Sequence, residues 1–169
     1  MNPAFASVAQ YKKLFAEMVT WLDKAIAYAE AKHFDPAVLF DARLAPDQYP
    51  FMGQVLSACN IAVYGAARLA GKERPADSHP ETMAELKASI AEVVAHLEGY
   101  EESDFVGWEA RVVPLSFFPG KGMAGEAYLY EMLTPNVLFH ATTAYAILRH
   151  NGLDLGIADF LGPLPVQDL

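Results

Sequence analysis

Apolar residues near the start of the chain recur every three or four positions, which is the spacing of one face of an α-helix. Asn2 followed by Pro3 is typical of a helix start, because an asparagine side chain caps the first turn and proline there needs no backbone hydrogen bond. The pattern predicts a long first helix whose apolar face consists of Val8, Tyr11, Phe15, Met18, Leu22, Ile26 and Ala29.

The same spacing predicts a second and a third helix. The second runs from about Pro50 to Ala70, and Gly71 can end it in the left-handed conformation. The third starts with Thr82-Met83-Ala84-Glu85, the pattern of a capping box, and ends at Gly99. The second helix is rich in small residues that would let a neighbouring helix approach closely, namely Ala58, Ala62, Gly65 and Ala66.

A fourth helix is predicted from about Gly125 to His150, ending at Asn151-Gly152. Pro135 lies inside it. Because proline removes a backbone hydrogen bond and clashes with the preceding turn, we expect a kink or a break near Thr134.

The segment between the third and fourth helices has a different character. The stretches 111–115 and 116–118 are β-prone, and the following "PGKG" indicates a turn, so a short hairpin or extended excursion is expected there. The tail after Gly152 contains Pro163 and Pro165 and is expected to be mostly irregular and to lie against the body. The prediction is an all-α fold, a four-helix bundle with this excursion, in one domain over residues 1–169.

Composition and charge narrow the class of protein. The chain is 53% hydrophobic and 20% charged, as in soluble globular proteins, and its formal net charge is -9. Such a charge disfavours binding to nucleic acids and to anionic membranes. The start of the chain lacks the features of a signal peptide, and Cys59 is the single cysteine, so a cytoplasmic location is expected.

His140 is the main candidate for chemistry, because it interrupts the apolar stripe of the fourth helix and should face the interior. One interpretation is a neutral core histidine whose nitrogens are satisfied by neighbouring polar groups. The other is an acid or base in a small polar pocket that could bind a small molecule. The candidate pocket consists of His140, Asn136, Gln54, Thr143 and Cys59.

Three stretches resemble a bacterial family of unknown function in the DinB/YfiT-like superfamily, which includes metalloenzymes. They are "ARLAPDQYPFMGQVLSACN" (42–60), "LTPN" (133–136) and "FHATTAYAILRHNGLDLGIADFLG" (139–162). The resemblance implies a four-helix bundle that is commonly dimeric. It also implies that some relatives bind a divalent metal through three histidines, one on the second helix and two at an H-x-x-x-H spacing on the last. Thiol-dependent transferases and isomerases are among those relatives.

The three-histidine pattern is absent from this sequence. Four residues from His140 stand Asn136 and Ala144, and the second helix contains no histidine. Asparagine is a poor ligand for zinc or nickel, and two ligands such as Cys59 and His140 rarely hold a metal tightly. We therefore predict no metal and no cofactor.

Two hypotheses about function follow. The first is an uncharacterised bundle protein that forms a homodimer, because its fourth helix is hydrophobic all round and cannot hide that surface alone. The alternative is a metal- or thiol-dependent enzyme of the transferase or isomerase type with a pocket around His140.

Overall fold

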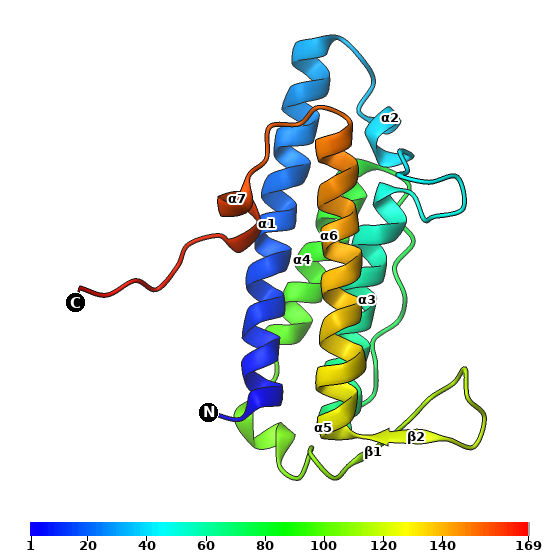
Figure 1. Ribbon diagram of the computed structural model, residues 1–169, viewed down its shortest axis with the longest axis vertical. Helices are drawn as coiled ribbons and strands as arrows, with labels where there is room; N and C mark the ends of the chain where they lie inside the picture. The colour runs from blue at the N-terminus through cyan, green and yellow to red at the C-terminus, as the bar shows by residue number, and fades with distance from the viewer. Residues whose placement is uncertain (169) are drawn as a thin grey trace.

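The computed structural model describes residues 1–168, and it is mostly helical (Figure 1). Four helices are long, and the other elements are short. The long helices are α1 (Pro3–Lys32), α3 (Phe51–Ala70), α4 (Met83–Glu98) and α6 (Thr134–His150). The short elements are α2 (Ala37–Phe40), α5 (Gly125–Ala127), α7 (Ile157–Leu161), the 3₁₀-helix η1 (Glu102–Phe105), the π-helix η2 (Tyr128–Leu133), β1 (Val112–Pro114) and β2 (Gly122–Ala124).

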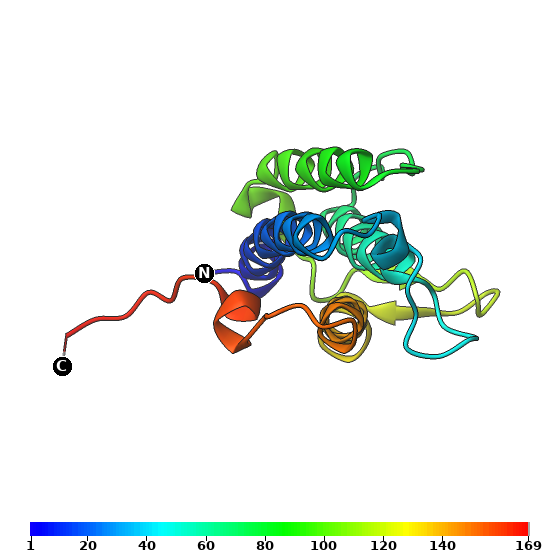
Figure 2. The ribbon, with the colours of Figure 1, turned by 90° about the horizontal axis from the view of Figure 1, so that it is seen from above.

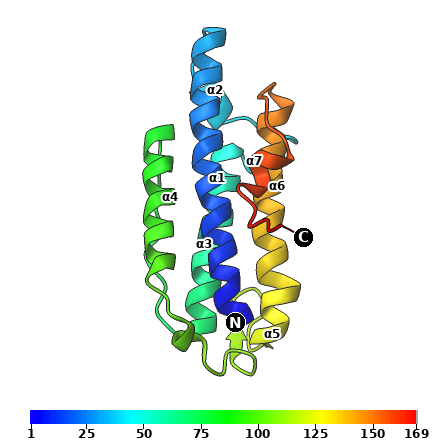
Figure 3. The ribbon, with the colours of Figure 1, turned by 90° about the vertical axis from the view of Figure 1, so that its left-hand side faces the viewer.

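The long helices lie side by side in three layers. Seen from above, α4 forms one outer layer, α1 and α3 the middle layer, and α6 the other outer layer (Figure 2). Helix α3 packs against both α6 and α4, while α1 packs against α4. The short helix α7 packs on α1 and lies between α1 and α6 (Figure 3). The side of α6 that faces away from α3 is therefore not covered by another long helix.

The helix ends predicted from local sequence are confirmed, with one difference. The Asn2 side chain accepts a hydrogen bond from the Ala4 amide at 2.9 Å, and Gly71 ends α3 at φ 68°. Thr82 Oγ1 accepts from the Glu85 amide at 3.2 Å, but the Glu85 carboxylate accepts from the Glu81 amide rather than from Thr82. The capping box is thus present in only one of its two directions.

The fourth predicted helix is interrupted before Pro135, as its proline indicated. The backbone changes from the short helix α5 to the π-helix η2 at Tyr128, and returns to α-helical geometry in α6 at Thr134. A π-helical turn includes one extra residue, which relieves the clash between a proline ring and the preceding turn. The chain therefore bends its hydrogen-bond pattern instead of stopping.

The predicted excursion is a hairpin in which β1 and β2 pair antiparallel, with Val113 opposite Met123. The second β-prone stretch, 116–118, is a turn and not a strand, because the partner of β1 begins only after the glycines of "PGKG". The prediction for the tail was wrong in two respects. Residues 157–161 form helix α7, and the chain beyond Gly162 leaves the body instead of lying against it (Figure 1).

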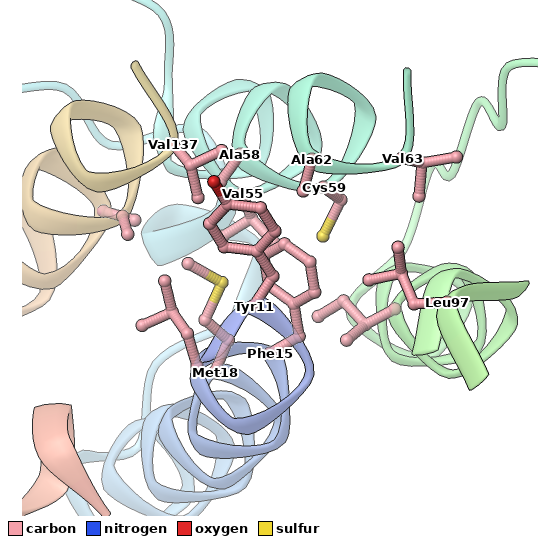
Figure 4. Close-up of a cluster of buried hydrophobic side chains, with 14 of the residues drawn as sticks. Tyr11, Phe15, Met18, Val55, Ala58, Cys59, Ala62, Val63, Leu97 and Val137 are labelled. Atoms are coloured by element: carbon pink, nitrogen blue, oxygen red, sulfur yellow. The ribbon is translucent and has the colours of Figure 1, made fainter. Parts of the chain in front are cut away.

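One connected set of buried apolar side chains joins α1, α3, α4 and α6. Figure 4 shows part of it, with Tyr11 and Phe15 of α1 pointing toward α3. The predicted apolar face of α1 is buried apart from the half-buried Ile26, but Trp21 and Leu14 are buried as well. Because α1 lies in the middle layer, it buries a wider surface than a single stripe.

No helix within residues 1–168 is long and apolar enough to cross a membrane.

Candidate functional site

His140 is joined to α3 by a short chain of hydrogen bonds. Its Nδ1 lies 2.7 Å from Oε1 of Gln54, and Nε2 of Gln54 donates to the backbone oxygen of Tyr49 at 3.3 Å. Since the Gln54 amide nitrogen is engaged with Tyr49, its oxygen faces the imidazole, and Nδ1 of His140 carries the donated hydrogen. The second ring nitrogen, Nε2, then carries the free lone pair of the neutral imidazole.

Aromatic rings flank the imidazole on the surface of the protein. The Tyr49 ring stacks on His140 with 6.4 Å between ring centroids and 15° between planes, and the Phe139 ring lies 5.2 Å away edge-on. Both rings are largely in solvent, with 60% of Tyr49 and 56% of Phe139 exposed. His140 is half-buried, so the prediction of an interior imidazole was wrong. The ring lies at the rim of the α3–α6 interface.

Partial burial lowers the pKa of His140 below its ordinary value, because the charged form loses hydration. Its bonded neighbour, Gln54, is a neutral amide and gives no charge that would stabilise an imidazolium. A carboxylate in that place would hold the proton and raise the pKa. The arrangement therefore favours a neutral histidine that accepts a hydrogen bond or a proton weakly at Nε2.

The other predicted site residues are placed separately from this pair. Oγ1 of Thr143 donates to the backbone oxygen of Phe139 at 2.8 Å, within its own helix turn. Asn136 is half-buried on α6, one turn before His140. Cys59 points into the core toward Phe15 and Leu97 (Figure 4), and burial raises the pKa of its thiol to about 12. A thiol of that pKa is inert as a nucleophile.

Gln54 and Cys59 are both on α3 but face different neighbours. They are five residues apart, which corresponds to about 140° around a helix of 3.6 residues per turn. Gln54 therefore faces α6 and His140, while Cys59 faces α1 and α4. The structure brings together two of the five predicted site residues, His140 and Gln54.

The donor groups around His140 do not fit a three-histidine metal site. The residue one turn after it is the fully buried Ala144, and the residue that α3 presents is an amide, Gln54, bonded to Nδ1. Across the described part of the chain, no group of three or more His, Cys, Asp or Glu side chains is arranged to hold a metal ion.

Tyr49 is the residue of this site that the sequence interpretation missed. It belongs to the loop before α3, where no periodic pattern assigns a direction to a side chain. The available signal was its position directly before Pro50, which restricts the preceding residue to extended backbone. Its backbone oxygen holds Gln54, and its ring covers one face of His140.

Two hollows lie close to the surface, and both are lined by residues other than His140. One encloses about 730 Å³ between the hairpin and Arg68. The other is a groove of about 200 Å³ between α1, α6 and α7, which has Leu138 on its wall.

The lowered pKa of His140 predicts a dependence of stability on pH. Because the unfolded imidazole binds a proton more readily than the folded one, the free energy of unfolding should fall as the pH drops below about 6.5. The His140→Gln variant should lose part of this fall, since its side chain does not titrate. Urea unfolding at about pH 7.5 and about pH 5.5 measures the difference. The exposed His150→Gln is the control, and an equal pH dependence in both variants would contradict the assignment.

Comparisons with known proteins agree with this architecture. The crystal structure of a DinB family member protein from Shewanella denitrificans is 40% identical in sequence, with a TM-score of 0.90 over 96% of this chain and 93% of that chain. No curated protein matches the chain. The fold and the similarity define a helical protein of the DinB-like class. Within that class, the chain belongs to the family described as a domain of unknown function, DUF1993, whose model matches residues 5–161.

Proposed function

We propose that the four long helices form a DinB-type four-helix bundle, in one domain, that acts as a homodimer and lacks the metal centre of its metalloenzyme relatives. The observation that carries the proposal is the uncovered outer face of α6. Between Glu131 and Arg149 the sequence has no charged residue, although α6 lies in an outer layer. An outer helix of a monomer normally carries charged side chains on its solvent face.

The exposed side chains on this face are large and apolar. Phe139 is 56% exposed, Leu138 is 42% exposed, and Tyr130 and Tyr49 add 54% and 60% exposed rings nearby in sequence or on His140. Contiguous exposed apolar surface of this kind marks an interface more often than a free surface. A second copy is the occupant that needs no further partner, and a two-fold axis would place the same face on both subunits.

His140 has a hydrogen-bonding role in this proposal. It joins α6 to Gln54 of α3 at the edge of the face, and its pKa keeps it neutral. No cofactor is required for this role. The location expected for the protein remains the cytoplasm, where the single thiol of Cys59 would stay reduced.

Light scattering at micromolar concentration tests the dimer. The native protein should have twice the mass of one chain, and Phe139→Glu should shift it to the monomer, because a carboxylate buried in the interface would lose its hydration. Val106→Glu is the control, since Val106 is also exposed but lies at the end of η1. A monomeric native protein would refute the proposal, as would an equal loss of dimer in the control.

Metal analysis of protein purified without an affinity tag tests the second part. We expect less than stoichiometric metal, and no difference between the native protein and His140→Ala. Stoichiometric zinc or nickel that is lost in His140→Ala would overturn the proposal and favour the metal-dependent enzyme.

A further inference from the structure

The last described residues form an arm that leaves the body of the protein. Residues 163–168, here called the arm, are all exposed and extend away from α7 (Figure 2). Two of them are apolar, with Leu164 57% and Val166 84% exposed. An exposed pair of branched apolar side chains, separated by one residue, is suited to binding in a groove.

The point where the arm leaves is fixed. Helix α7 is held by the Trp21 indole, whose Nε1 donates to the backbone oxygen of Asp159 at 2.8 Å. Gly162 follows with φ 62° and ψ -165°, a conformation suited to glycine, and a Cβ there would overlap the Glu17 side chain. The arm is thus aimed away from α1 by the residues at its base.

Two prolines keep the arm from turning back. Pro163 and Pro165 have fixed φ angles and restrict the residues before them to extended conformations. An extended arm of this length reaches roughly 19 Å at about 3.1 Å per residue. Folding back into the groove beside its own base would require a reversal that this sequence disfavours.

The groove between α1, α6 and α7 has the chemistry to receive such an arm. Its walls are apolar, formed by Leu14, Leu138 and Phe160, with Lys13 and Gln10 also lining it. Lys13 forms no ion pair within the part of the chain that the structure describes. Extended proline-containing segments bind well in apolar grooves with an aromatic wall, because little conformational freedom is lost.

We propose that the arm of one subunit binds in the groove of a second copy of the chain. Leu164 and Val166 pack on the apolar walls, and Asp168 pairs with Lys13. Leu138 belongs both to the groove and to the exposed face of α6, so the arm extends the interface proposed above. This inference rests on the proposed dimer, and by two-fold symmetry both arms are exchanged.

Cross-linking between two cysteine variants tests the exchange. One protein carries Gln10→Cys in the groove and the other Gln167→Cys in the arm, so that Lys13 and Asp168 are retained. The native Cys59 is buried and does not compete for the reagent. With a short bismaleimide, the mixture should give a covalent dimer on a denaturing gel, while each protein alone should give little. Glu30→Cys, exposed near the far end of α1, replaces Gln10→Cys as the control and should not link.

The outcomes separate this inference from the proposed dimer. If light scattering shows a dimer but the mixture does not link, the arm exchange is wrong and the dimer stands. If a chain with both cysteines links within a monomer, the arm lies in its own groove and the exchange is wrong. If the native protein is monomeric, both proposals fail.

Substitutions in the arm give an independent measurement. Leu164→Ser with Val166→Ser should raise the dissociation constant of the dimer by on the order of a hundredfold, since each lost apolar contact is expected to cost about tenfold. Lys13→Glu should weaken the dimer, and adding Asp168→Lys in the same chain should restore it. An unchanged dissociation constant in the serine variant, or no restoration by Asp168→Lys, would overturn the inference.

Discussion

Replacing Trp21 by alanine should lower the free energy of unfolding by about 3–5 kcal/mol, the cost of removing a large aromatic side chain from a closed core. Trp21 has no exposed surface. Its ring packs against Tyr145 of α6 and Phe160 of α7, with centroid distances of 5.8 and 5.6 Å. The substitution therefore leaves a cavity where α1, α6 and α7 meet. Urea unfolding, followed by circular dichroism and extrapolated to zero denaturant, measures the loss.

Trp21→Phe separates the packing from the hydrogen bond. It keeps an aromatic ring but loses the bond from Nε1 to the backbone oxygen of Asp159, so a smaller loss is expected, on the order of 1–2 kcal/mol. Limited proteolysis should cut after α7 faster in Trp21→Ala than in the native protein, because α7 loses its anchor. A loss below about 1 kcal/mol in Trp21→Ala would contradict the central position of this residue.

The elements that depend on local chemistry were predictable from the sequence. Asn2, Thr82 and Gly71 begin or end helices through contacts with residues a few positions away, and the structure confirms all three. The interruption before Pro135 is equally local, although a π-helical turn in place of a break depends on the packing of Leu133 against α3.

Features that depend on the arrangement of helices were not predictable. Trp21 lies outside the stripe chosen for the first helix, and it is buried because α1 lies between α4 and α7. Helix α7 and the departure of the arm from the body depend on that same contact. Periodicity gives the direction of a side chain on its own helix, but it does not give the number of neighbours that the helix will have.

The candidate site shows the same division. His140 and Gln54 were both chosen as polar residues on helix faces, and their hydrogen bond confirms that the two faces meet. Cys59 was assigned to the pocket from the same helix, although its angle on α3 directs it to the opposite side. Tyr49 was missed because the position of a loop residue is set by tertiary contacts that no spacing reveals.

Replacing Gly65 by alanine should destabilise the protein by about 1–3 kcal/mol, the usual cost of overpacking a core. In an open helix the same change would stabilise by about 1 kcal/mol, because alanine is the better helix former. Here a Cβ at Gly65 would overlap the Leu133 side chain, so α3 and the π-helix η2 would have to separate. A reversed sign is therefore the mark of the close approach that the small residues of α3 predicted.

Gly53→Ala is the matched control, because Gly53 lies on the same helix but its added Cβ would meet its nearest atom at 3.1 Å, which a small shift relieves. Its stability should stay the same or rise by up to about 1 kcal/mol. Since Gln54 and His140 bond across the same α3–α6 interface, separation of the helices should also expose the imidazole. The pKa of His140, followed by NMR titration, should then move up toward its ordinary value in Gly65→Ala. A stabilised Gly65→Ala with an unchanged His140 titration would show that α3 and η2 do not approach as closely as the structure has them.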